Sequence, residues 1–117
     1  MTAEEFERLV RNTVSDWAFI THVNTVDRTD YALKMRLIVD AECFVQIYAN
    51  LNKDIFSFTL ILNRMRIYGR DSIDGRWHRH PEHAPGTHDV SAEGSRPVTI
   101  GQFLAEAQDI LQRNGVL

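Results

Sequence analysis

The sequence YALKMRLIVD, residues 31–40, alternates apolar and polar side chains, and this period of two restricts the segment to a strand with one wet face. Later segments have the same strand character, and short polar turns separate them. The strand-like segments are 31–39, 43–49, 56–62 and 65–70, and the turns are 40–42, 50–54 and 63–64. Short turns join antiparallel strands, so we expect an antiparallel meander across residues 18–70. It has four to five strands, because the weaker alternation of residues 19–26 fits either an additional strand or a connection.

Helical spacing replaces the alternation at both ends of the chain, and a capping-box pattern opens each helical segment. The capping pairs are Thr2 with Glu5 and Thr99 with Gln102. Apolar residues then recur at intervals of three and four, which predicts helices over residues 2–16 and 99–114. The order of elements predicts a single α+β domain over residues 1–117, with the N-terminal and C-terminal helices packed on one face of the sheet.

The composition limits the class of protein. With 44% hydrophobic and 25% charged residues, the chain has the balance of one globular domain rather than a disordered segment. No apolar run is long enough to cross a membrane, and the first residues lack the basic and then apolar pattern of a secretory signal. We therefore expect a soluble, cytoplasmic protein with no membrane contact. Cys43 is the single cysteine, which excludes an internal disulfide and a four-cysteine zinc site.

The charges are unevenly distributed along the chain. The formal net charge of −3 argues against a generally basic nucleic-acid binder. Most of the cations nevertheless lie between residues 28 and 79, and they are nearly all arginines, whose planar guanidinium groups suit phosphate and carboxylate partners. This distribution indicates either an anionic partner or a set of solvated strand faces.

Four of the five histidines lie in the segment GRWHRHPEHAPGTHD, residues 75–89. All three prolines follow the predicted sheet, so residues 71–97 are expected to form a long ordered loop rather than a central strand. His78 and His80 are two residues apart, which in an extended chain places both imidazoles on one side and Arg79 on the other.

Three interpretations of this loop remain open. As a metal site, its imidazoles and a carboxylate form a ligand set for Zn²⁺ or Ni²⁺. The candidate ligands are His78, His80, His83, His88 and Asp89. As a catalytic site, it supplies a general base and a general acid for RNA cleavage. The candidates for this role are His80, His83 and His78, beside the cations Arg76 and Arg79. As a structural loop, it closes the end of the sheet, with Trp77 packed on the core and the histidines bonded to main-chain carbonyls.

Four stretches, followed by a terminal helix, resemble the TumE-like toxin family. They are LKMRLIVDAECFVQIYA, FSFTLIL, IYGRDSIDGRW and HRHPEHAPGTHD. His80-Pro81-Glu82 matches the histidine-proline-glutamate step of the family, and Asp74 corresponds to its turn aspartate. Arg79 separates the two histidines that are adjacent in the family. The resemblance covers roughly residues 31–111 and fits either this family or a sister family of uncharacterised archaeal proteins.

The resemblance implies a toxin-type protein of a toxin–antitoxin locus, with a cognate antitoxin as its partner. Residues 76–89 would then act on or bind RNA or a protein partner. The binding residues would be Arg76, Trp77, Arg79 and Glu82. The alternative is a non-catalytic metal-binding or homo-oligomeric interaction module, in which the exposed edge of the meander pairs with its twin in a homodimer.

Overall fold

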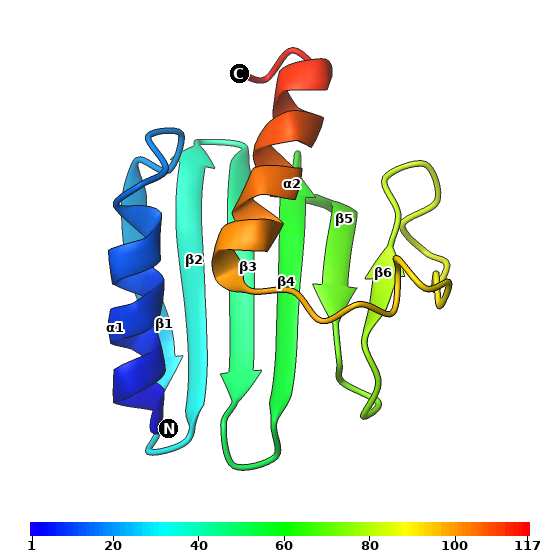
Figure 1. Ribbon diagram of the computed structural model, residues 1–117. Coiled ribbons are helices and arrows are strands. Elements are labelled where there is room, and N and C mark those ends of the chain that lie inside the picture. The colour runs from blue at the N-terminus through cyan, green and yellow to red at the C-terminus, as the bar shows by residue number, and fades with distance from the viewer.

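The computed structural model describes residues 1–117 as two helices and six strands (Figure 1). The elements are α1 (Ala3–Val14), β1 (His22–Arg28), β2 (Ala32–Asp40), β3 (Cys43–Asn50), β4 (Ile55–Leu62), β5 (Met65–Asp71), β6 (His78–His80) and α2 (Ile100–Arg113). The strands form one antiparallel sheet in the order β1-β2-β3-β4-β5-β6, so each strand pairs with its neighbours in sequence. The predicted α+β class and the meander are confirmed, but the sheet has six strands rather than four to five.

The first and last strands account for the difference. The prediction placed an optional strand at 19–26, whereas β1 begins at His22, because Phe19 and Ile20 are buried in the connection that leads from α1 to the sheet. The prediction of a loop over residues 71–97 was wrong at two places. Asp71 still belongs to β5, and His78–His80 pairs with β5 as a short edge strand. Three residues are too few for an alternating pattern to stand out in a sequence.

Both helices begin with the predicted capping boxes. The Thr2 hydroxyl accepts from the backbone N–H of Glu5, and the Thr99 hydroxyl accepts from that of Gln102. The caps themselves have extended backbone angles, so the helices begin one residue later than predicted. The sharpest turn of the meander lies at Asn63-Arg64, where both residues have positive φ, as a two-residue hairpin of the mirror-image type I requires.

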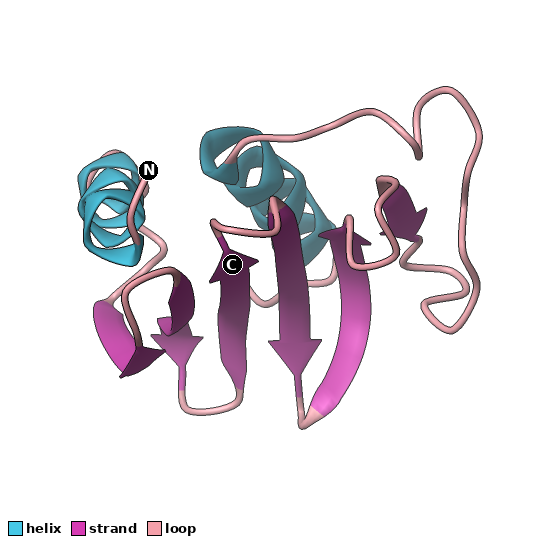
Figure 2. Cartoon of the chain, turned by 90° about the horizontal axis from the view of Figure 1, so that it is seen from below, coloured by secondary structure: helices cyan, strands magenta, loops and turns pink.

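The two helices lie on one face of the sheet, as Figure 2 shows, and a long connection from β6 returns to α2 on that side. The core between the helices and the sheet is apolar and fully buried. Its largest side chains are Phe103, Leu33, Met35, Leu37, Ile47, Leu60, Leu104 and Leu111. One charged side chain shares this layer, because Arg70 on β5 is fully buried and donates to the Glu106 carboxylate of α2 at 2.7 Å.

No helix covers the other face of the sheet, which we call the open face. Its side chains are those that alternate with the buried core positions along each strand, and the antiparallel register places them in rows across the sheet. The residues of the open face used below are Lys34, Arg36, Phe44, Gln46, Tyr48, Ser57, Thr59, Arg66, Gly69, Asp71, His78 and His80.

Neither α1 nor α2 has the length and apolar character that a membrane-spanning helix needs. Cys43 is fully buried at the start of β3, and burial raises the pKa of its thiol to about 11. The thiol is therefore a small apolar side chain of the core at neutral pH.

Candidate functional site

Three of the predicted histidines converge at the β6 edge of the open face. His78 and His80 project to the same side of β6, with ring centroids 5.1 Å apart. The ring of His88 stacks on His78 at 4.3 Å and meets the edge of His80 at 4.7 Å. Their ring nitrogens lie within 4.8 Å of one another, close enough to be considered together as a ligand set. We call these three residues the histidine cluster.

The chain reaches His88 by folding back along β6. Two turns follow the strand, with the N–H of Ala84 bonded to the carbonyl of Pro81 and that of Thr87 bonded to the carbonyl of Ala84. The backbones of Arg79 and Asp89 then exchange two hydrogen bonds of 3.1 and 2.8 Å, as an antiparallel pair does. This register sets His88 opposite His80, so the returning segment brings a third imidazole to the same side.

Asp71 on the neighbouring strand β5 lies between the two buried histidines. Its Oδ1 is 2.9 Å from Nε2 of His78, and its Oδ2 is 2.9 Å from Nε2 of His80. The register makes this possible, because Asp71 is the direct partner of His78 across β5 and β6. All three side chains are nearly or fully buried, with 11% of the Asp71 side chain and 4–5% of each imidazole exposed.

Gly69 lies on β5 beside the second buried imidazole. It is the direct partner of His80 on β5, and a Cβ atom at this position would lie 3.7 Å from Cδ2 of His80 and 3.3 Å from the carbonyl oxygen of Phe58. The latter distance is tighter than ordinary van der Waals contact. The Cβ would meet the imidazole at an ordinary van der Waals distance, so the crowding at this position is against the β4 backbone.

A neutral His80 has too few N–H groups for the two acceptors that its ring nitrogens face. Its Nδ1 is 3.1 Å from the carbonyl oxygen of Pro85 and its Nε2 is 2.9 Å from the Asp71 carboxylate, and both partners only accept. A neutral imidazole carries one N–H and can satisfy only one of these contacts. Burial, followed by the nearby Arg66 cation, lowers the pKa of His80, which disfavours the doubly protonated ring that would satisfy both.

His78 has a related arrangement. Its Nε2 faces Asp71, and its Nδ1 lies 3.6 Å from Oδ1 of Asp74, a distance too long for a direct hydrogen bond. Both buried imidazoles therefore direct Nε2 toward the same carboxylate and Nδ1 toward a second oxygen. A metal-binding histidine donates one ring N–H to a carbonyl or carboxylate and holds the ion with its other nitrogen, so an ion at this site would replace the direct Nε2 contacts with Asp71.

The cluster borders a pocket of about 260 Å³ on the open face. Arg66, Ile73 and Asp74 complete its wall beside Asp71 and the three histidines. Arg66 donates to the carbonyl of Pro85 at 2.9 Å and has no carboxylate partner. His88 is exposed and neither of its ring nitrogens makes a hydrogen bond, so it is the imidazole that is free to meet a ligand. The pocket thus combines ligand nitrogens, a carboxylate and a cation.

The remaining predicted residues lie apart from this pocket. His83 is exposed in the turn after β6, beside Tyr68, Arg79, Pro81 and Glu82. Glu82 is ion-paired with Arg113 of α2, and Asp89 accepts from Nε of Arg79 at 3.0 Å. Arg76 is exposed in the turn between β5 and β6. The geometry therefore leaves His83 and Asp89 outside the predicted ligand set.

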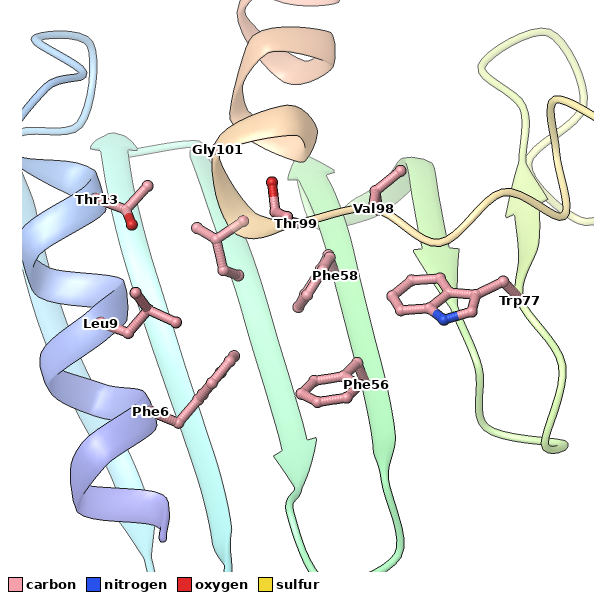
Figure 3. A pocket seen from close by; sticks show the side chains of 10 residues that line it. Phe6, Leu9, Thr13, Phe56, Phe58, Trp77, Val98, Thr99 and Gly101 are labelled. Carbon is pink, nitrogen blue, oxygen red and sulfur yellow. The ribbon is translucent and has the colours of Figure 1, made fainter. Parts of the chain in front are cut away.

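Trp77 lies on the opposite side of the sheet from the histidine cluster. Its ring stacks on Phe56 at 6.3 Å and lines an apolar cavity of about 390 Å³ between α1 and the start of α2, as Figure 3 shows. The cavity contains no titratable group, and two threonine side chains are its main polar members. The prediction that Trp77 packs on the core agrees with this position.

Asp71, Gly69 and Arg66 were missed by the sequence analysis. They lie on β5, and only the pairing of β5 with β6 brings them beside the histidines. The short segment between residues 69 and 80 carried a usable signal, because a turn such as SIDG can join two antiparallel strands.

A comparison with known proteins finds no matching family model, no similar curated protein and no similar solved structure.

Proposed function

We propose that the histidine cluster and Asp71 form a binding site for one divalent transition-metal ion. The observation that carries this proposal is the shared orientation of the two buried imidazoles, whose Nε2 atoms both lie 2.9 Å from the Asp71 carboxylate. If Nδ1–H of His80 donates to Pro85, Nε2 of the same ring is left with a lone pair that faces the Asp71 carboxylate. A cation placed among them satisfies these atoms and leaves Nδ1–H of His80 to donate to Pro85.

The ligands in this proposal are the Nε2 atoms of His78 and His80, a carboxylate oxygen of Asp71, and a ring nitrogen of His88. Imidazole and carboxylate ligands suit Zn²⁺ and Ni²⁺. Ligand atoms in a tetrahedral zinc site are about 3.4 Å apart, given metal–ligand bonds of roughly 2.1 Å. To reach this spacing the ring nitrogens, which lie within 4.8 Å of one another, would move closer together, and the Asp71 oxygens, 2.9 Å from the Nε2 atoms, would move slightly apart from them.

The site is suited to act on a phosphodiester. A metal ion polarises a phosphoryl oxygen and lowers the pKa of a bound water, and Arg66 supplies a second positive charge in the same pocket. The resemblance to TumE-like toxins implies an activity directed at RNA. We therefore propose that the protein is a toxin-type RNA-cleaving protein in which the metal centre carries the reaction and a cognate antitoxin holds it inactive.

A second candidate is metal-free acid–base cleavage of RNA. The observation that favours it is the exposed, unbonded His88 beside Arg66. An imidazole can act as the general acid or base of RNA cleavage, and Arg66 would bind the phosphate. This candidate needs His88 and Arg66 but no ion.

Metal analysis of protein purified without a histidine tag tests the first proposal. We expect close to one equivalent of zinc or nickel per chain, lost in His78→Ala/His80→Ala and retained in His83→Ala, which removes an exposed histidine outside the cluster. Equal metal contents in the two variants would refute the site. Cleavage of a labelled RNA is then measured before and after treatment with EDTA. Activity that survives complete metal removal but is lost in His88→Ala would support the metal-free candidate.

A further inference from the structure

We infer that the open face binds single-stranded RNA and guides it into the histidine cluster. This inference names the substrate of the proposed function. It rests on that function only for the reaction at the histidine cluster. The binding surface itself is carried by other residues, on β2, β3 and β4. Its test can therefore fail or succeed independently of metal binding.

A row of residues, polar except for Gly69, leads across the open face from β2 to the buried His80 on β6. The register pairs Arg36 with Gln46, Gln46 with Thr59, Thr59 with Gly69, and Gly69 with His80. Neighbouring strands are about 4.8 Å apart, so four spacings place the row's two ends roughly 19 Å from each other. This length accommodates a few nucleotides laid across the strands.

A second row runs beside the first and reaches the other buried histidine. It consists of Lys34, Tyr48, Ser57, Asp71 and His78, each paired with the next. Tyr48 is 36% exposed in the middle of the sheet, where its ring offers a flat surface to a base. Such aromatic side chains on an uncovered sheet are the platform on which RNA-binding domains stack splayed bases.

Six arginines form ion pairs, and none of them lies on the open face. Every arginine that forms an ion pair lies on a helix, on the helix-facing side of a strand, or in the connection to α2. These residues are Arg11, Arg28, Arg70, Arg79, Arg96 and Arg113. The open-face cations Lys34, Arg36 and Arg66 form no ion pair, and the nearest acid in register is Asp27, opposite Lys34 on the edge strand. The unpaired charges are therefore available to phosphates.

The chemistry of the rows favours RNA over a protein partner. The two rows carry cations, hydroxyls and an amide, and an apolar row of Ile38, Phe44 and Ile61 lies at their side, whereas a protein interface has its apolar residues at the centre. Arg36 lies over the ring of Phe44, with its guanidinium carbon 4.8 Å from the ring centroid, which holds the cation at the surface. Gln46, Ser57 and Thr59 add donors and acceptors that can bond base edges and the 2′-hydroxyl group, which DNA lacks.

Fluorescence anisotropy with a 5′-labelled 12-nucleotide uridine RNA tests the inference. The full-length protein is titrated as isolated and again after EDTA treatment, at two salt concentrations. We expect Arg36→Ala and Tyr48→Ala each to weaken binding fivefold or more, and Arg36→Ala also to reduce the salt dependence. The matched control is Arg8→Ala, which removes an exposed arginine without an ion pair from α1, on the other side of the molecule. It should bind as the wild type does.

Three results would overturn the inference. They are unchanged binding in Arg36→Ala and Tyr48→Ala, an equal loss in Arg8→Ala, and equal affinity for the DNA of the same sequence. Thermal melting of each variant checks that the fold is intact. The variants distinguish the metal site from the RNA-binding surface. His78→Ala/His80→Ala should lose the metal and keep RNA binding. If Arg36→Ala loses RNA binding and keeps a normal metal content, the open face binds RNA even if the metal centre proves inactive.

Discussion

Replacing Asp71 by asparagine distinguishes a metal site from a buried ion-pair network. The two side chains have nearly the same shape, but the amide has a donor and no charge. In metal-free protein, an amide between the two Nε2 atoms can donate to one neutral imidazole and accept from the other. Each such hydrogen bond contributes about 1 kcal/mol. We therefore expect metal-free Asp71→Asn to be at least as stable as metal-free wild type, by up to about 1 kcal/mol.

Metal binding should reverse this order. An ion at one hundred times its dissociation constant stabilises the folded wild type by about 2.7 kcal/mol. For a chain of this size that corresponds to a rise in Tm of roughly 10 °C. Asp71→Asn lacks the charged ligand and should show little or no rise.

Differential scanning fluorimetry of both proteins, with EDTA and with a zinc series, measures both effects. The reasoning fails if zinc leaves the wild-type Tm unchanged while Asp71→Asn lowers the metal-free stability by about 3 kcal/mol or more, since that is the cost of breaking a buried ion pair. His83→Ala is the control, and its zinc response should match that of the wild type.

Three further predictions concern the surroundings of the site and the core. Arg70→Met should lower the free energy of unfolding by about 3 kcal/mol in urea denaturation, because it leaves Glu106 without its buried partner, and a loss below about 1 kcal/mol would contradict this. Gly69→Ala should lower the free energy of unfolding by about 1 kcal/mol in urea denaturation, because its Cβ would lie 3.3 Å from the carbonyl oxygen of Phe58, and an unchanged stability would contradict this. Cys43, with a thiol pKa of about 11, should resist iodoacetamide at pH 8 until urea unfolds the protein, whereas labelling of the native protein within minutes would contradict its burial.

The helices and the central strands were predictable because local chemistry specifies them. The capping pairs at Thr2 and Thr99 and the alternation around Leu33 to Leu37 need no distant partner, and the structure contains them where the sequence indicates. The β1 strand was misplaced because apolar side chains in a connection imitate the core face of a strand. The β6 strand was missed because a three-residue edge strand has no periodicity of its own.

The candidate site was predictable only in part, for a similar reason. The spacing of His78 and His80 fixes that both imidazoles share one side, and the structure agrees. His88 joins them because a main-chain pairing between residues 79 and 89 folds the loop back, and Asp71 joins them through the register of β5 with β6. Both contacts depend on the tertiary fold, and the spacing of residues along the sequence does not predict them. His83 was grouped with the others because it is close in sequence, but the turn at Pro81 directs it away.

The position of a bound ion tests the central claim most directly. Crystals of the tag-free protein grown with zinc, measured on both sides of the zinc absorption edge, should give one strong anomalous peak about 2.1 Å from the Nε2 atoms of His78 and His80, next to Asp71. The absence of a peak among these residues, with the two imidazoles still directed at the carboxylate, would contradict the metal centre.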